Sequence, residues 1–501
     1  MCPLRKSLFL ALLIVLSIFS ACTKEDIETP VSPSLSNFTF LKANNPDLLN
    51  NVYTYIDGDK FYGSIPYEVD INHLIASFDF VGSEVRIGGQ IQNSGSTVND
   101  FHEPVTYTVV GQNGITKDYS IDIVRFTGLP VINIYTENGV EITSKDDYVT
   151  GFISIEEWNG LDSTSGNIYI RGRGHSTWYM HPKKPYQLKF ENKTEVLGMP
   201  EDKKWIFLAE YSDKTLIRNR LAFEMGYISN LEWTPECQYS EVYINDEYRG
   251  TYNITQKVEE SDNRVNIGSD GFLCEIDNSD HIEEGDIVFN SSRFTIQVKE
   301  PDIAVESPEY EYIKNQVLTF ENVLYSDDFT DPVNGYSKYI DVDSFVDWYL
   351  INEIAKNVDS KDYSSMYFSL VPGEKIKMGP LWDFDLGFGN VDYADSQYPE
   401  GFWVKDHQWF SRLFEDPAFV EKVKTRFLFF RSNQDYFTQI IDDQTDYLRW
   451  AQQENDNRWD LFGNYVWPNP VVYNTHIQEV NYLKYWFHER MKWLENAYMW
   501  M

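Results

Sequence analysis

The chain has 501 residues, of which 42% are hydrophobic and 16% aromatic, enough to build substantial cores and more than one domain. The 78 Asp and Glu residues outnumber the 42 Lys and Arg residues, and the formal net charge is -36. Because binding to nucleic acid needs an excess of positive charge, we exclude nucleic acid as an expected partner. An acidic excess of this size favours solubility and says little else about function.

The N-terminal end of the chain, residues 1–22, has the features of a secretory signal. Two basic residues, Arg5 and Lys6, precede an apolar run over residues 8–19, and small residues then lead to Cys22. The apolar run is too short to span a bilayer comfortably, which is typical of a signal. The stretch resembles a bacterial lipoprotein signal, and this resemblance implies that Cys22 is the acylated first residue of the mature chain.

Residues 23–31 are charged and then contain proline, a composition typical of a flexible tether. The lysine followed by acidic residues resembles the surface-export signal of Bacteroidetes lipoproteins, although an ordinary linker would have the same composition. No later apolar run in the sequence is long enough to cross a membrane. We therefore expect an exported outer-membrane lipoprotein at the cell surface, attached to the membrane through its lipid anchor only.

Two cysteines remain once Cys2 leaves with the signal and Cys22 is lipidated. Cys237 and Cys274 are able to pair in an oxidising compartment, but two buried free thiols fit the sequence equally well. The sequence leaves both possibilities open.

Residues 32–128 predict a small all-β accessory domain. Short alternating runs such as NFTFL, TYTVVGQ and DYSIDIV are separated by Gly, Asn and Asp residues. Short strands with frequent turns are typical of a sandwich of the immunoglobulin type. The segment contains no convincing catalytic cluster, so we interpret it as a spacer or a binding module.

Residues 129–501 have a mixed pattern, with strands first and helices last. Strand-like runs include VINIYT, PYQLKF and GFLCEID. Helical spacing is clear over residues 212–226, over residues 344–356 with Asp343 or Ser344 as N-cap, and near the C-terminus. The apolar face of the last helix contains Ile477, Val480, Leu483, Phe487, Met491 and Leu494. This order of elements predicts a two-lobed α+β architecture.

Common hydrolase and metalloprotease motifs do not occur in the sequence. The residues of this region that could bind a ligand are first of all a set of cations. RGRGHSTW, residues 171–178, places two arginines and two glycines in a predicted turn, where guanidinium and backbone N–H groups are able to hold phosphate oxygens. Further cations follow at Lys184, Lys189 and Arg218. Taken singly, each is explained better by a structural ion pair or a solvated basic edge than by phosphate binding.

The most distinctive carboxylates lie in PLWDFDLGFGN, residues 380–390. A strand ending here would project Asp383 and Asp385 from the same side, close enough to share one cation. An isolated D-x-D pair is also found where one aspartate caps a turn and the other faces water. Asp359 precedes this run, in a loop after a predicted helix. This is the order in which protein kinases place their catalytic-loop and magnesium aspartates.

These segments together resemble the spore-coat protein H (CotH) kinase-like family of atypical kinases. The resemblance covers roughly residues 130–500 and rests on RGRGHSTW with PKKPYQLKF, KWIFLAEYSDKTLIRNRLA, EVYINDEYRGTYNITQKVEE, GFLCEID and the closing NVDS, MYFSL and KIKMGPLWDFDLGFGN. It implies a divergent protein-kinase-like fold and ATP-dependent phosphoryl transfer to Ser or Thr of secreted or surface proteins, with Mg²⁺ or Mn²⁺. The implied partners are a nucleotide and a protein acceptor.

The resemblance also implies roles for individual residues. Asp359 matches the catalytic-loop aspartate that orients or deprotonates the acceptor hydroxyl. Asp383 matches the metal-binding aspartate of the W-D-x-D motif, with Asp385 as a second acid nearby. The cations implied to hold the nucleotide phosphates are Arg173, Lys184 or Lys189, and Arg218.

Two positions depart from the family pattern. Ser365 stands where many members carry asparagine, and a serine hydroxyl is a poorer metal ligand than an amide carbonyl. Gln256 stands where an acidic residue is usual. These departures keep an alternative open, in which the chain is a non-catalytic pseudokinase that acts as a surface adhesin or a structural lipoprotein.

Overall fold

The computed structural model describes residues 32–501 except for residues 49, 113, 157–162 and 362. The predicted signal, Cys22 and the tether therefore lie outside the described residues. The chain divides into two compact units, Met1–Arg125 and Phe126–Met501, each of which has its own hydrophobic core.

The described part of the N-terminal unit is built from β-strands. One sheet has the order β2-β1-β6, a second the order β3-β4-β11-β10-β7-β8, and a third pairs β5 with β9. Along β11, Tyr119, Ile121 and Ile123 are buried and alternate with more exposed residues, as the period of a half-buried strand requires. The strand bounds are β1 Ser34–Phe40, β2 Val52–Tyr53, β3 Tyr55–Asp57, β4 Lys60–Pro66, β5 Leu74–Ile75, β6 Ser77–Val81, β7 Glu84–Ile87, β8 Gln90–Ile91, β9 Val98–Asn99, β10 Val105–Val110 and β11 Thr116–Phe126.

The C-terminal unit begins with a closed barrel of order β12-β13-β14-β15-β16-β18-β17, in which β12 and β17 pair in parallel and close the ring. Tyr186, Leu188 and Phe190 of β15 point into the barrel core, so Gln187 and Lys189 face outward. The strand bounds are β12 Val131–Thr136, β13 Val149–Glu156, β14 Ser163–Gly172, β15 Tyr186–Val196, β16 Met199–Leu208, β17 Cys237–Ile244 and β18 Glu247–Gln256.

A five-stranded sheet follows the barrel, with the order β20-β21-β19-β22-β23. Its strands pair antiparallel throughout, and they share one large core with the helices that follow. The strand bounds are β19 Phe272–Ile276, β20 Val288–Asn290, β21 Thr295–Glu300, β22 Met366–Leu370 and β23 Lys377–Met378.

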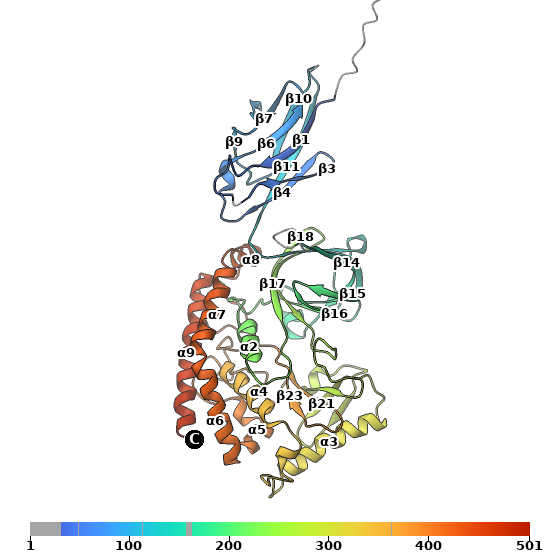
Figure 1. Cartoon of the computed structure of the whole chain (residues 1–501), viewed down its shortest axis with the longest axis vertical. Coiled ribbons are helices and arrows are strands. Elements are labelled where there is room, and N and C mark those ends of the chain that lie inside the picture. The colour runs from blue at the N-terminus through green and yellow to red at the C-terminus, as the bar shows by residue number, and fades with distance from the viewer. Residues whose placement is uncertain (1–31, 49, 113, 157–162, 362) are drawn as a thin grey trace, which may run out of the picture. The chain divides into compact units, whose positions relative to one another are not determined.

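Helices form most of the C-terminal half of this unit, and the long helices α6, α7 and α9 pack alongside one another (Figure 1). Helix α4 is buried on nearly all sides, and apolar residues occur all round it. Its buried Asp347 and Glu353 form ion pairs with Arg426 and Arg490. The bounds of the helices are α1 Ser176–Met180, α2 Arg218–Tyr227, α3 Pro308–Leu324, α4 Val342–Ala355, α5 Gln408–Leu413, α6 Pro417–Ser432, α7 Gln434–Tyr447, α8 Ala451–Trp459 and α9 His476–Met499. Short 3₁₀ turns are η1 Ile71–His73, η2 Glu137–Gly139, η3 Ser279–His281, η4 Tyr336–Lys338 and η5 Val404–Asp406.

Three local predictions are wrong. Helix α4 starts earlier than expected, because the side chain of Asp341 accepts a hydrogen bond from the Ser344 N–H and is the N-cap. Ile477, expected on the apolar face of α9, is 52% exposed. Strand β23 ends at Met378, so Asp383 and Asp385 lie in a loop rather than at the end of a strand.

The two cysteines of the described residues do not pair with each other. Cys237 and Cys274 are both buried and both free. Burial raises the pKa of the Cys237 thiol to about 11 and raises the pKa of the Cys274 thiol as well.

Within the described ranges, every helix is too short or too polar to span a membrane.

Candidate functional site

A polar cavity of about 450 Å³ lies in the C-terminal unit. The barrel contributes residues of β14, β15 and β16, and the five-stranded sheet contributes residues of β19, β21 and β22. Loops around residues 359–365 and 382–386 complete the lining. The carboxylates that line it are Asp146, Glu210, Glu275, Asp277, Glu283, Asp286, Asp359, Asp383 and Asp385, and the Lys and Arg residues are Lys145, Arg171, Arg173 and Lys299.

The arginine–glycine segment enters the cavity through a turn that requires its glycines. A side chain at Gly172 would collide with the Trp178 ring, whose nearest atoms lie 2.4 Å from the Cβ position, and Gly174 has φ +82°. The guanidinium of Arg173 lies over the ring of Trp382, 5.5 Å from its centroid. Burial lowers the pKa of Arg173, while Asp383 opposes this effect. Arg173 lines the cavity, where its guanidinium is placed to bind an anion.

Asp359 lies in the loop that follows α4 and lines the same cavity. The loop is held by its own backbone, since the Ser364 N–H donates to the Asp359 carbonyl over 3.2 Å. Burial, followed by the charges of Asp383 and Asp277, raises the pKa of Asp359 to about 7. A half-buried carboxyl with this pKa is suited to accept a proton near neutral pH.

Asp383 and Asp385 meet at the cavity although they do not lie on a strand. Asp383 has φ 65°, in the left-handed region, and its Oδ2 lies 3.4 Å from the Ser365 hydroxyl. The Ser212 hydroxyl donates to Oδ2 of Asp385 over 3.0 Å. Burial, and then the negative charge of Asp383, raises the pKa of Asp385 well above its ordinary range. A bound cation would relieve this repulsion.

The donors of this cluster suit a hard divalent cation. Proteins commonly hold Mg²⁺ through one or two carboxylates together with the phosphates of a substrate. Asp383 and Asp385 supply carboxylates, and Ser365 offers a weaker oxygen donor. Nowhere in the described part of the chain do three or more His, Cys, Asp or Glu side chains gather as a metal site. Asp383 and Asp385 are the residues of this cluster that could hold such a cation.

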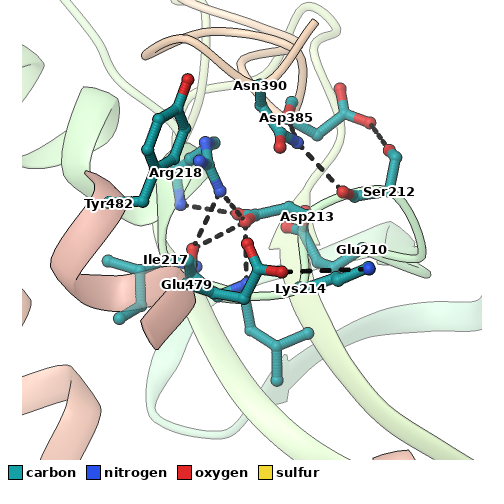
Figure 2. A network of polar contacts seen from close by, with 12 residues as sticks. Glu210, Ser212, Asp213, Lys214, Ile217, Arg218, Asp385, Asn390, Glu479 and Tyr482 are labelled. Carbon is teal, nitrogen blue, oxygen red and sulfur yellow. Dashed lines mark hydrogen bonds and ion pairs between the residues drawn. The ribbon is translucent and has the colours of Figure 1, made fainter. Parts of the chain in front are cut away.

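A network of buried amides fixes the backbone around the two aspartates. The Phe384 N–H donates to Oδ1 of Asn219 over 2.8 Å, and the Asn357 amide donates to the Asp383 carbonyl over 3.1 Å. The Asn390 amide bridges the carbonyls of Asp385 and Ser212 at 2.8 and 3.0 Å (Figure 2). The loop is therefore positioned by α2, by the end of α4 and by the segment after β16.

A second set of charged residues in the cavity comes from the five-stranded sheet. Lys299 Nζ lies 3.3 Å from Glu275 Oε2, and Glu275 Oε1 accepts from the Ser365 N–H over 3.1 Å. Burial raises the pKa of Glu275. The spacing of Gln297 and Lys299 in the sequence predicts that both lie on one face of a strand. Only the sheet register shows that this face of β21 meets Glu275.

The other predicted phosphate-binding cations do not line the cavity. Lys184 donates to the Trp178 carbonyl over 2.6 Å, and Lys189 lies on the outer face of the barrel, paired across strands with Lys204. Arg218 is 0% exposed and forms an ion pair with Asp213. Of the predicted residues, the structure brings together Arg173, Asp359, Asp383 and Asp385.

These features define an α+β protein with a carboxylate-rich cavity between a barrel and an antiparallel sheet. The family model described as CotH kinase protein matches residues 170–494, more than half of the sequence, and the chain belongs to this family, as its sequence predicted. No curated protein matches the chain. Among solved structures, a candidate glycoside hydrolase from Bacteroides thetaiotaomicron aligns with 14% identity over 57% of this chain and 88% of that chain, with a TM-score of 0.18. A likeness this weak supports no statement about fold or activity.

Proposed function

We propose that this chain is an atypical protein kinase that uses ATP with Mg²⁺ or Mn²⁺ to phosphorylate Ser or Thr of secreted or surface proteins. The observation that carries the proposal is that Arg173, Asp359, Asp383 and Asp385 line one cavity although they come from segments up to about 200 residues apart. Such a set combines an anion-binding cation, a carboxylate that orients the acceptor hydroxyl and a pair of cation ligands, which are parts that phosphoryl transfer needs.

Each residue has a distinct task in this proposal. Asp383 and Asp385 hold the cation, which when bound neutralises charge on the ATP phosphates. Arg173 binds phosphate oxygens, and Lys299, which lines the same cavity, assists it. Asp359 holds the acceptor hydroxyl in line with the phosphate. Arg218 acts on the site indirectly by holding its backbone.

The finer architecture and the location are part of the same proposal. The barrel interior has a core separate from that of the sheet and helices, and residues of both parts line the cavity, which supports a divergent two-lobed kinase-like arrangement. The all-β N-terminal unit is interpreted as an immunoglobulin-like accessory domain. We place the protein at the outer membrane as a surface lipoprotein anchored through Cys22.

One observation favours a second candidate, a non-catalytic surface protein that keeps the kinase-like shape. Ser365 lies beside Asp383 at the position where many family members have asparagine, and its hydroxyl is a weaker ligand. A pseudokinase of this kind would act as an adhesin or a structural lipoprotein.

A thermal-shift experiment separates the two candidates. The chain from residue 23 onward is heated with ATP, with Mg²⁺ or Mn²⁺, and with both together. We expect ATP and metal together to raise Tm, because a ligand that binds only the folded state stabilises it. The shift should be lost in Asp383→Asn and Asp385→Asn and kept in Asp79→Asn, a control in the other unit. No shift at millimolar ATP and metal would reject the kinase in favour of the non-catalytic candidate.

A further inference from the structure

A histidine–aspartate pair lines the cavity and has no role in the function proposed so far. Nδ1 of His281 lies 2.8 Å from Oδ1 of Asp277, and the two side chains are 14% and 10% exposed. Asp277 follows β19 directly, and His281 ends the short turn η3. Both residues line the same cavity as Asp359.

The surroundings of His281 fix the orientation of its ring. The His175 ring packs 4.6 Å away, and the Tyr363 ring meets it edge-on at 5.0 Å. Since Nδ1 is held by Asp277, the free ring nitrogen Nε2 points away from that carboxylate. The hydrogen bond that this ring makes within the described residues is the one from Nδ1 to Asp277.

The pair also lies on the same side of the cavity as Asp359. The negative charge of Asp277 contributes to the raised pKa of Asp359. Both carboxylates contribute to the raised pKa of Tyr363, whose ring contacts His281. Lys145, Glu283 and Asp286 line the cavity as well, and the first two form an ion pair with each other. The charge of Asp280 acts on Tyr363, and the charge of Lys299 acts on Asp277.

We propose that His281, oriented by Asp277, is the base that removes the proton from the acceptor hydroxyl. This inference rests on the proposed phosphoryl transfer and deepens it. The acceptor proton moves to Nε2 of His281, the acceptor oxygen forms a bond with the γ-phosphorus, and the bond between that phosphorus and the β,γ-bridging oxygen breaks. ADP leaves with that electron pair, and Asp277 stabilises the imidazolium that results.

The chain contains a matched pair that serves as a control. Nδ1 of His73 lies 2.7 Å from Oδ2 of Asp70, but these side chains are 74% and 53% exposed and belong to the N-terminal unit. This pair has the same histidine–aspartate contact but does not line the cavity. A His73→Gln substitution should therefore leave phosphoryl transfer unchanged.

The test measures phosphate transfer from γ-labelled ATP to casein, to the chain itself or to water between pH 5.5 and 9. It compares the wild-type chain from residue 23 with His281→Gln, Asp277→Asn and the double variant. We expect His281→Gln to lower kcat about 100-fold or more, with little change in the Tm shift that ATP and metal produce. The acidic limb of the pH profile should become shallower, and the double variant should be no slower than His281→Gln.

Chemical rescue is a second measurement, because added imidazole restores activity only where the missing side chain transferred a proton. Free imidazole should restore part of the activity of His281→Ala and none of the activity lost in Asp383→Asn. If His281→Gln and His281→Ala keep the wild-type rate and pH profile, the inference is wrong and the proposed function stands. If the wild-type chain transfers no phosphate to any acceptor, the inference is wrong, and if it also fails to bind ATP with metal, the proposed function is wrong as well.

Discussion

Arg218 and Asp213 form an ion pair in which neither side chain is exposed to solvent, with 2.5 Å between Nη1 and Oδ1. The Arg218 N–H also donates to Oδ2 of the same aspartate, and Nε donates to the Gly387 carbonyl over 3.2 Å. Figure 2 shows this pair beside the loop that carries Asp385, with Glu479 and Tyr482 of α9 close by. The pair therefore links the start of α2 to the aspartate loop.

Removing one partner of this pair should destabilise the protein strongly. Arg218→Ala leaves a buried carboxylate without its cation, so we expect the free energy of unfolding to fall by about 3–5 kcal/mol. Lys422→Ala is a matched control, because Lys422 and Asp343 form an ion pair with both side chains more than half exposed, and this change should cost less than about 1 kcal/mol. Denaturant unfolding followed by fluorescence measures both. Equal losses would contradict a structural role for the buried pair.

Periodic segments of the sequence predicted the fold well. The apolar spacing of residues 344–356 and of the C-terminal helix is strong, and the structure has α4 and α9 there. The ends were less predictable. The Asp341 cap is decided by one hydrogen bond, and Ile477 lies in the first turn of α9 but is exposed, whereas His476 and Glu479 in the same turn are buried.

The site was predictable only where a motif already carried the chemistry. Asp383 and Asp385 were found from their spacing, but the strand assigned to them was wrong because the backbone turns at Asp383 with a positive φ. His281 and Lys299 reach the cavity through sheet register and a short turn, which no local pattern encodes. In the sequence, Arg218 cannot be told apart from a cation that binds phosphate. Its burial in the structure shows that it serves as a structural cation instead.

The elevated pKa of Asp359 predicts a pH-dependent stability. The folded chain holds the Asp359 proton up to about pH 7, whereas the unfolded chain releases it near 4, so stability falls as pH rises through this window. Asp359→Asn removes the buried charge and should stabilise the metal-free protein at pH 8 by at most about 4 kcal/mol. The gain should shrink toward pH 5. Thermal unfolding in a chelator measures it, with the exposed Asp327→Asn as control, and a pH-independent gain would be contradictory.

Ser365 offers a gain-of-function prediction. Its φ is 60°, a conformation that asparagine tolerates better than serine, and its hydroxyl lies 3.4 Å from Asp383. Ser365→Asn should therefore be accommodated and should tighten metal-dependent ATP binding several-fold, because an amide oxygen is the better ligand. Calorimetric titration with Mg²⁺ and ATP checks this, beside Ser365→Ala. Weaker binding by the asparagine variant than by the alanine variant would show that the position does not face the cation.

The two buried thiols should be inert in the native protein. Burial raises the pKa of Cys237 to about 11 and also raises the pKa of Cys274, so little thiolate is available to react at pH 8. The chain from residue 23 should show two thiols by Ellman's reagent in guanidinium chloride and almost none without it. Fast native labelling, or two missing thiols in unreduced denatured protein, would contradict the free, buried state.

Transfer of labelled γ-phosphate by the purified chain from residue 23 tests the central claim most directly. The reaction is run with Mg²⁺ or Mn²⁺ and casein, beside Asp359→Ala, Asp383→Ala and the control Asp79→Ala. The account predicts metal-dependent labelling that is lost in the first two variants and kept in the control. Equal labelling by all four proteins, or no labelling together with no binding of ATP and metal, would contradict it.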